Sequence, residues 1–81
     1  MILVHPDFPR ITIDAEVCFG KPCIKNTRMP VSSLLDYLSS GMTIEQLIGE
    51  FNWLTREDVL EALAFSSQMI QDRFIPIQKV S

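Results

Sequence analysis

Three helices are predicted by the stretch PVSSLLDYLSSGMTIEQLIGEFNWLTREDVLEALAF, which occupies residues 30–65. Apolar residues recur in it at intervals of three and four, the spacing that places them on one face of an α-helix. Gly41 and Thr43 mark the end of a first helix over residues 31–40 and the start of a second over residues 44–51. Thr55 is the predicted N-cap of the third helix.

The third helix carries apolar residues on two sides. One side has Val59, Leu60, Leu63 and Ile70, and the other has Ala62, Phe65 and Met69. A helix of this kind lies at the centre of a fold or shares one side with another chain. At the corner before this helix, Phe51 and Trp53 are expected to fill the core.

A β-hairpin is predicted before the helices, within residues 10–24. Ile11–Ile13 alternates and is β-branched, which favours a strand, and residues 17–19 are expected to extend again. Residues 23–24 are expected to pair only at an edge, because Pro22 has no backbone donor. Asn26 is expected to make a left-handed turn, which asparagine tolerates better than most residues.

These elements predict a mainly α fold, a three-helix helix-turn-helix bundle of winged-helix or homeodomain-like type, preceded by a short β-hairpin. The expected organisation is an N-terminal arm over residues 1–9, a β-hairpin plus trihelical domain over residues 10–73, and a C-terminal tail over residues 74–81.

Composition limits the classes of function. A chain of 81 residues has room for one small domain. Its net charge of −3 argues against binding polyanions by overall charge. No apolar run is long enough to span a bilayer, and residues 1–4 lack the charged start of a signal peptide, so the expected location is the cytoplasm, with no membrane partner.

The predicted DNA contacts are basic residues. Lys21, Lys25 and Arg28 fall within eight residues that contain no acid, and Arg56 begins the third helix. That helix continues with Glu57, Asp58 and Glu61, which repel phosphates, so the hairpin bases are the preferred contacts. Two alternatives remain open: the bases are ordinary solvated charges, or Arg28 hydrogen-bonds backbone carbonyls of a neighbouring helix.

The sequence predicts no enzyme, no cofactor and no metal site. It has no nucleophile with a paired base and no glycine-rich phosphate loop. Cys18 and Cys23 have only His5 as a further zinc ligand, one fewer than a structural site needs. Both cysteines are expected to be free, partly buried thiols.

Self-association is predicted through the third helix and the tail. The apolar residues beyond the needs of a three-helix core, and therefore the predicted partner or dimer interface, are Phe65, Met69, Phe74, Ile75 and Ile77. The expected assembly is a homodimer.

Several motifs resemble one known family. The run FGKPCIKNTRMPV (residues 19–31), the leucine-rich helix ending at Gly41, and the segments Thr43–Ile48 and Leu54–Val59 resemble the domain-of-unknown-function family 433 over residues 11–66. Asn26 stands where the family usually has glycine, and Asn52 where proline is common. The resemblance implies a helix-turn-helix-like domain preceded by a β-hairpin, similar to VapB-type antitoxins that silence a toxin with a PIN-like nuclease fold.

Two functions follow as hypotheses. The first is a small, non-catalytic DNA-binding regulator, the antitoxin of a toxin–antitoxin pair, that binds a PIN-like toxin and its own promoter as a dimer. The second is a protein-interaction module that neutralises a partner without binding DNA, since an acidic helix suits a basic nuclease and repels nucleic acid.

Overall fold

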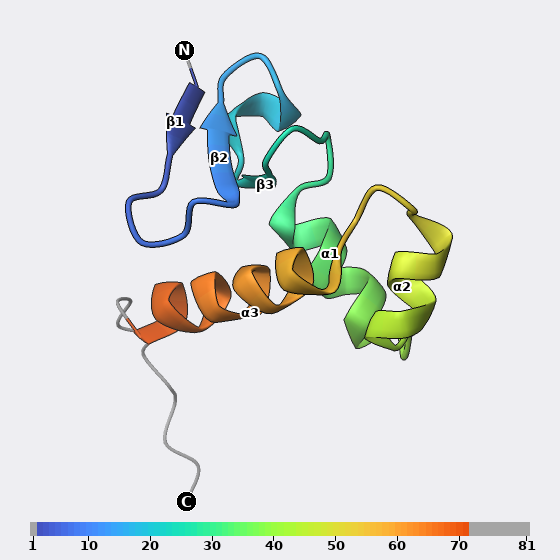
Figure 1. Ribbon diagram of the computed structural model, residues 1–81. Coiled ribbons are helices and arrows are strands. Elements are labelled where there is room, and N and C mark those ends of the chain that lie inside the picture. The colour runs from blue at the N-terminus through green and yellow to red at the C-terminus, as the bar shows by residue number, and fades with distance from the viewer. Residues whose placement is uncertain (1, 72–81) are drawn as a thin grey trace, which may run out of the picture.

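Three α-helices pack against a small antiparallel sheet in the computed structural model, which describes residues 2–71 (Figure 1). The helices are α1 (Val31–Ser39), α2 (Ile44–Glu50) and α3 (Arg56–Gln71), and together they hold close to half of the described residues. The strands are β1 (Ile2–Val4), β2 (Ile11–Asp14) and β3 (Cys23–Ile24), with a short 3-10 turn, η1, at Cys18–Gly20. The predicted three helices after a β segment are therefore confirmed.

Local signals explain where the helices begin and end. Thr43 and Gln46 form a reciprocal capping box at the start of α2, as their spacing predicts. Gly41 ends α1 with a φ of 106°, and its N–H donates to the carbonyl of Leu38. Thr55 caps α3 by accepting from the N–H of Asp58 at 3.1 Å.

The sheet has three strands in the order β1-β2-β3, one more than the predicted hairpin. The additional strand lies within residues 1–9 and pairs with β2 through Leu3 and Ile13. Residues 17–19 do not form the expected strand. Only Val17 makes an isolated bridge, and the chain then coils through η1, where Cys18 and Phe19 have positive φ.

The core lies between the sheet and the helices. Its largest fully buried side chains are Ile11, Ile24, Leu34, Leu47 and Val59. The centre of the fold is α3, which contacts α1, α2 and β2. Figure 1 shows it crossing beneath the sheet, with α1 and α2 beside its N-terminal half.

The two sides predicted for α3 are only partly right. The side toward the core carries Val59, Ala62 and Phe65, all buried, whereas Leu60, Leu63 and Ile70 are exposed. Val59 and Leu60 are adjacent apolar residues, and only the position of the sheet and α1 decides which of them faces inward.

The corner between α2 and α3 corrects a second expectation. Phe51 packs against the core as predicted, but Trp53 is 48% exposed. Leu54 takes the core position instead, and it is buried. Trp53 therefore contributes an aromatic ring to the surface.

Within residues 2–71, no helix has the length and apolar character needed to cross a membrane.

Candidate nucleic-acid interface

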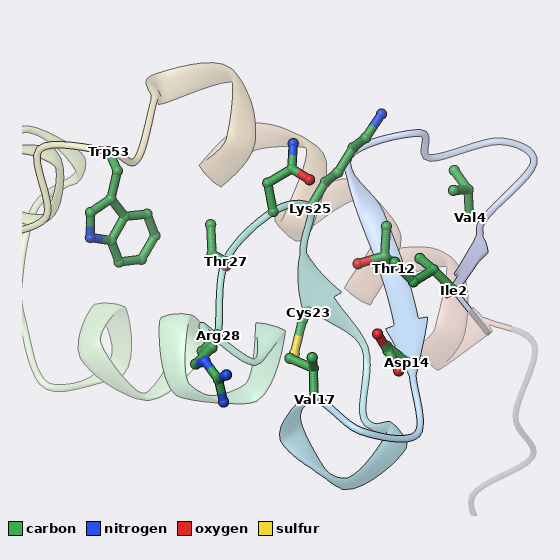
Figure 2. A pocket seen from close by; sticks show the side chains of 11 residues that line it. Ile2, Val4, Thr12, Asp14, Val17, Cys23, Lys25, Thr27, Arg28 and Trp53 are labelled. Carbon is green, nitrogen blue, oxygen red and sulfur yellow. The ribbon is translucent and has the colours of Figure 1, made fainter.

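A groove of about 590 Å³ runs across the outer face of the sheet (Figure 2). Figure 2 shows Trp53 at one end, the β1 side chains Ile2 and Val4 at the other, and the turn after β3 between them. Thr12 and Cys23 are opposite each other in the strand register and lie among its lining residues. The groove thus combines a sheet face, a basic turn and one exposed aromatic ring.

The turn after β3 is built to present Lys25 and Arg28. Asn26 has a φ of 62°, which confirms the predicted left-handed turn. The Thr27 hydroxyl donates to the carbonyl of Ile24 at 2.7 Å and accepts from the N–H of Met29 at 3.0 Å. These bonds tie the turn into the short segment that leads to α1.

Both basic side chains of this turn are free for a ligand. Lys25 and Arg28 are exposed, and within residues 2–71 neither side chain makes an ion pair or hydrogen bond. In this part of the chain, therefore, the Arg28 side chain does not hydrogen-bond the carbonyls of a neighbouring helix, which was one of the two open alternatives. Beside them, Trp53 packs on Phe51 with ring centroids 5.5 Å apart.

The groove holds a thiol that is poorly suited to nucleophilic chemistry. Cys23 is buried, and burial, together with the neighbouring Cys18, raises the pKa of its thiol to about 12. Only the thiolate attacks electrophiles or binds metals, and this thiol stays protonated near neutral pH. Cys18 and Cys23 are both free, as predicted. Within residues 2–71 no cluster of three potential metal ligands occurs.

The other two predicted DNA contacts lie elsewhere. Lys21 is exposed but lines a different groove, between α1 and the C-terminal half of α3. Arg56 forms a salt bridge with Glu45 of α2. The pKa of Glu45 is lowered, first by a hydrogen bond from its own backbone and then by Arg56. The structure therefore brings together Lys25 and Arg28, and separates Lys21 and Arg56 from them.

Two acids of α3, Asp58 and Glu61, bind the residue just before β2. Asp58 Oδ1 accepts from Arg10 Nη1 at 2.8 Å, and Glu61 accepts from the backbone N–H of Arg10. The pKa of Arg10 is raised, chiefly by its hydrogen bond to Asp58. The sequence does not predict these contacts, because nothing local links Arg10 to residues so far along the chain.

The predicted interface residues of α3 belong largely to the fold itself. Phe65 is buried and meets Phe8 edge-on, with ring centroids 5.7 Å apart. Met69 is partly buried and packs against the core. Both also line the groove that contains Lys21. The remaining predicted interface residues, Phe74, Ile75 and Ile77, lie outside the described residues.

Comparison with known proteins agrees with the motifs. Residues 11–66 match the family described as "Protein of unknown function (DUF433)". This chain belongs to the DUF433 family. It is similar to the crystal structure of a DUF433 member protein from Anabaena variabilis ATCC 29413, with 34% sequence identity and a TM-score of 0.72. That similarity covers 76% of this chain and 61% of the other, so this chain spans less than two thirds of its neighbour. Comparison with curated proteins gives no match.

The family match separates the two ends of the groove in this DUF433 chain. The basic turn and Trp53 lie inside the matched residues, whereas Ile2 and Val4 precede them. The charges of Lys25 and Arg28 predict their place at a candidate site, whereas the sequence predicts Trp53 to lie in the core and not at the groove. A usable signal was present, since Trp53 stands next to Leu54 and only one of two adjacent apolar residues in a tight corner can face the core.

Proposed function

We propose that this chain is a non-catalytic DNA-binding regulator, the antitoxin-like member of a toxin–antitoxin pair in the cytoplasm. The observation that supports DNA binding is the groove face where Lys25 and Arg28 are exposed beside Trp53. Lysine and arginine neutralise phosphates, and an exposed indole ring offers a stacking or packing surface for a nucleotide.

In this proposal the α2–α3 pair has a helix-turn-helix-like arrangement and supports the DNA-binding surface. It does not itself contact a DNA groove with basic side chains. Arg56 is held by Glu45, and Asp58 is held by Arg10, so few charges at the start of α3 remain for a ligand. The turn after β3 is then the contact to phosphates, similar in role to β-ribbons that enter DNA grooves.

The proposed protein partner is a toxin with a PIN-like fold, as the family resemblance implies. The surface that supports a protein partner is the outer side of α3, where Leu60 and Leu63 are exposed. Exposed apolar residues gathered on one helix side favour association with another protein. The same observation favours the second candidate function, a module that neutralises its partner without binding DNA. In both forms the chain is proposed to act as a homodimer.

A gel-shift titration with the DNA upstream of the chain's own gene tests the first function. The double variant Lys25→Ala/Arg28→Ala should weaken binding and reduce the dependence of log K on log salt by about 1 for each lost phosphate contact. Lys25→Arg/Arg28→Lys is the matched control, because it keeps both positive charges at the same groove. No shift by the unmodified chain at low salt contradicts DNA binding and leaves the protein-interaction module.

The second function is tested by co-purification with the product of the neighbouring gene. The double variant Leu60→Ser/Leu63→Ser should lose that product, whereas Lys25→Ala/Arg28→Ala should retain it. Retention of the partner by both variants contradicts the role of the outer side of α3.

A further inference from the structure

The tip of η1 exposes one aromatic side chain almost completely. Phe19 is 97% exposed, and no other large apolar residue among residues 2–71 is as exposed. Its backbone is left-handed, with a φ of 56°, between Cys18 at 54° and Gly20 at 77°. Residues with a Cβ avoid this region, so the fold sustains strain to hold the ring outward.

The strained tip is fastened from both sides. The N–H of Gly20 donates to the carbonyl of Val17 at 3.2 Å, and the N–H of Lys21 donates to that of Cys18 at 3.1 Å. The Cys18 thiol donates to the carbonyl of Arg28 at 3.3 Å. The backbone that carries Phe19 is thus held in place, and a backbone that is already ordered lowers the entropy lost when a partner covers the ring.

A groove that suits such a ring begins two residues further along the chain. It has a volume of about 460 Å³ and lies between the Lys21–Pro22 segment, α1 and the C-terminal half of α3. Its apolar lining includes Leu35, Phe65 and Met69, and Lys21 provides a charge. Grooves of roughly 300–1,000 Å³ hold drug-sized ligands, so a phenyl ring can enter this one.

We propose that Phe19 inserts into this groove of a second copy of the chain, and that the second copy returns the same contact. A twofold dimer requires a surface that is complementary to itself, with projection and groove on one patch. Phe19 and the Lys21–Pro22 wall of the groove are near neighbours in the chain, so in the proposed dimer both contacts form close to one twofold axis. The interface rests on the homodimer of the proposed function and specifies how it forms.

Charge supports a second copy as the occupant. Glu16 is exposed just before η1, and its N–H is held by the Asp14 carboxylate at 2.9 Å. Lys21 lines the receiving groove. When Phe19 of one copy enters the groove of the other, the acid beside the projection approaches the base beside the groove, and the twofold axis repeats this pair.

Sedimentation of the full chain at concentrations from about 1 to 100 µM tests the proposal by the mass-action dependence of the dimer. Phe19→Ser removes the projection, and Ser32→Arg fills the groove from an exposed position at the start of α1. Each variant should dimerise at least tenfold more weakly than the unmodified chain. Leu60→Ser is the matched control, since it removes an exposed apolar side chain from the outer side of α3 and should leave the dimer intact.

Mixing the two variants gives the decisive observation. Neither variant alone can form a contact, but one Phe19→Ser chain and one Ser32→Arg chain together regain one of the two. Native mass spectrometry of an equal mixture should therefore show the mixed dimer in excess over both homodimers. Far-UV circular dichroism checks that each variant remains folded.

Three results overturn the proposal. They are a monomer at every concentration, a dimer lost in Leu60→Ser but kept in Phe19→Ser, and a mixture with no excess of the mixed dimer. The first shows that no second copy occupies the groove, and the second shows that the dimer forms through α3. DNA binding is read separately: a dimer that depends on Phe19 but gives no gel shift contradicts the proposed function alone, and a gel shift from a monomer contradicts this interface alone.

Discussion

Replacement of Asp58 by alanine should destabilise the fold far more than removal of its neighbouring acid. Asp58 is nearly buried, and its Oδ2 accepts from the N–H of Thr55 at 3.1 Å while Oδ1 accepts from Arg10. A hydrogen bond to a charged group contributes about 1.5–3 kcal/mol. Asp58→Ala should therefore lower the free energy of unfolding by about 2–3 kcal/mol, a large part of the roughly 4–12 kcal/mol expected for a chain of this size.

The assay is urea unfolding followed by far-UV circular dichroism. With a slope of about 1 kcal/mol per molar urea, the midpoint should fall by about 2–3 M. Glu57→Ala is the matched control: it removes an exposed acid from the same first turn of α3 and should cost less than about 1 kcal/mol. Midpoints within about 0.5 M of each other for the two variants refute the account of Asp58 as a link between α3 and the sheet.

Asp58→Asn separates the two contacts of this side chain. The amide oxygen still accepts from Thr55, but the ion pair with Arg10 is lost. The difference in the free energy of unfolding between Asp58→Asn and the unmodified chain should shrink in about 1 M NaCl, because salt screens the ion pair with Arg10 and leaves the cap on Thr55 unchanged. A difference that does not depend on salt contradicts the contribution of the ion pair.

Three further predictions concern single residues. Trp53→Ala should cost less than about 1 kcal/mol in urea unfolding, whereas Leu54→Ala should cost about 2–5 kcal/mol, because only Leu54 fills the core. Burial raises the pKa of Cys23 from 9.0 to about 12, so between these pH values the folded chain keeps a proton that the unfolded chain releases. The free energy of unfolding should therefore fall as the pH rises from 9.0 toward 12. In a separate measurement, iodoacetamide at about pH 8 should modify Cys18 before Cys23, as read by mass mapping. Asn26→Gly should leave the thermal midpoint unchanged or raise it, and Asn26→Ala should lower it by about 4–8 °C, because the φ of 62° suits glycine and strains alanine.

The helices were predictable because their signals are local. Thr43 and Gln46 lie three residues apart and form their box without help from the rest of the chain. Strand β1 was not predictable in this way, because Leu3 becomes part of a strand only by pairing with Ile13. The inward face of α3 likewise depends on Phe8, which packs on Phe65 from the other end of the chain.

The sequence predicts which basic residues belong to the candidate site, but not how the fold arranges them around a groove. Lys25 and Arg28 were identified as bases in a run without acids, and the structure places both at one groove. Lys21 was grouped with them because it is close in sequence. It precedes Pro22 and β3, whereas the other two follow β3, so it reaches a different side of the fold. Trp53 joins the groove only because the α2–α3 corner folds back beside the turn.

The contact between Arg10 and α3 also sets an order of events during synthesis. Arg10 precedes Asp58 by 48 positions and Glu61 by 51, so the sheet leaves the ribosome well before the helix that fastens it. At roughly 5–20 residues per second, that interval lasts about 2–10 seconds. During it, α3 is not yet present to pack against β2 and cover Ile11, so chaperones have a defined time in which to bind the nascent sheet before α3 is completed.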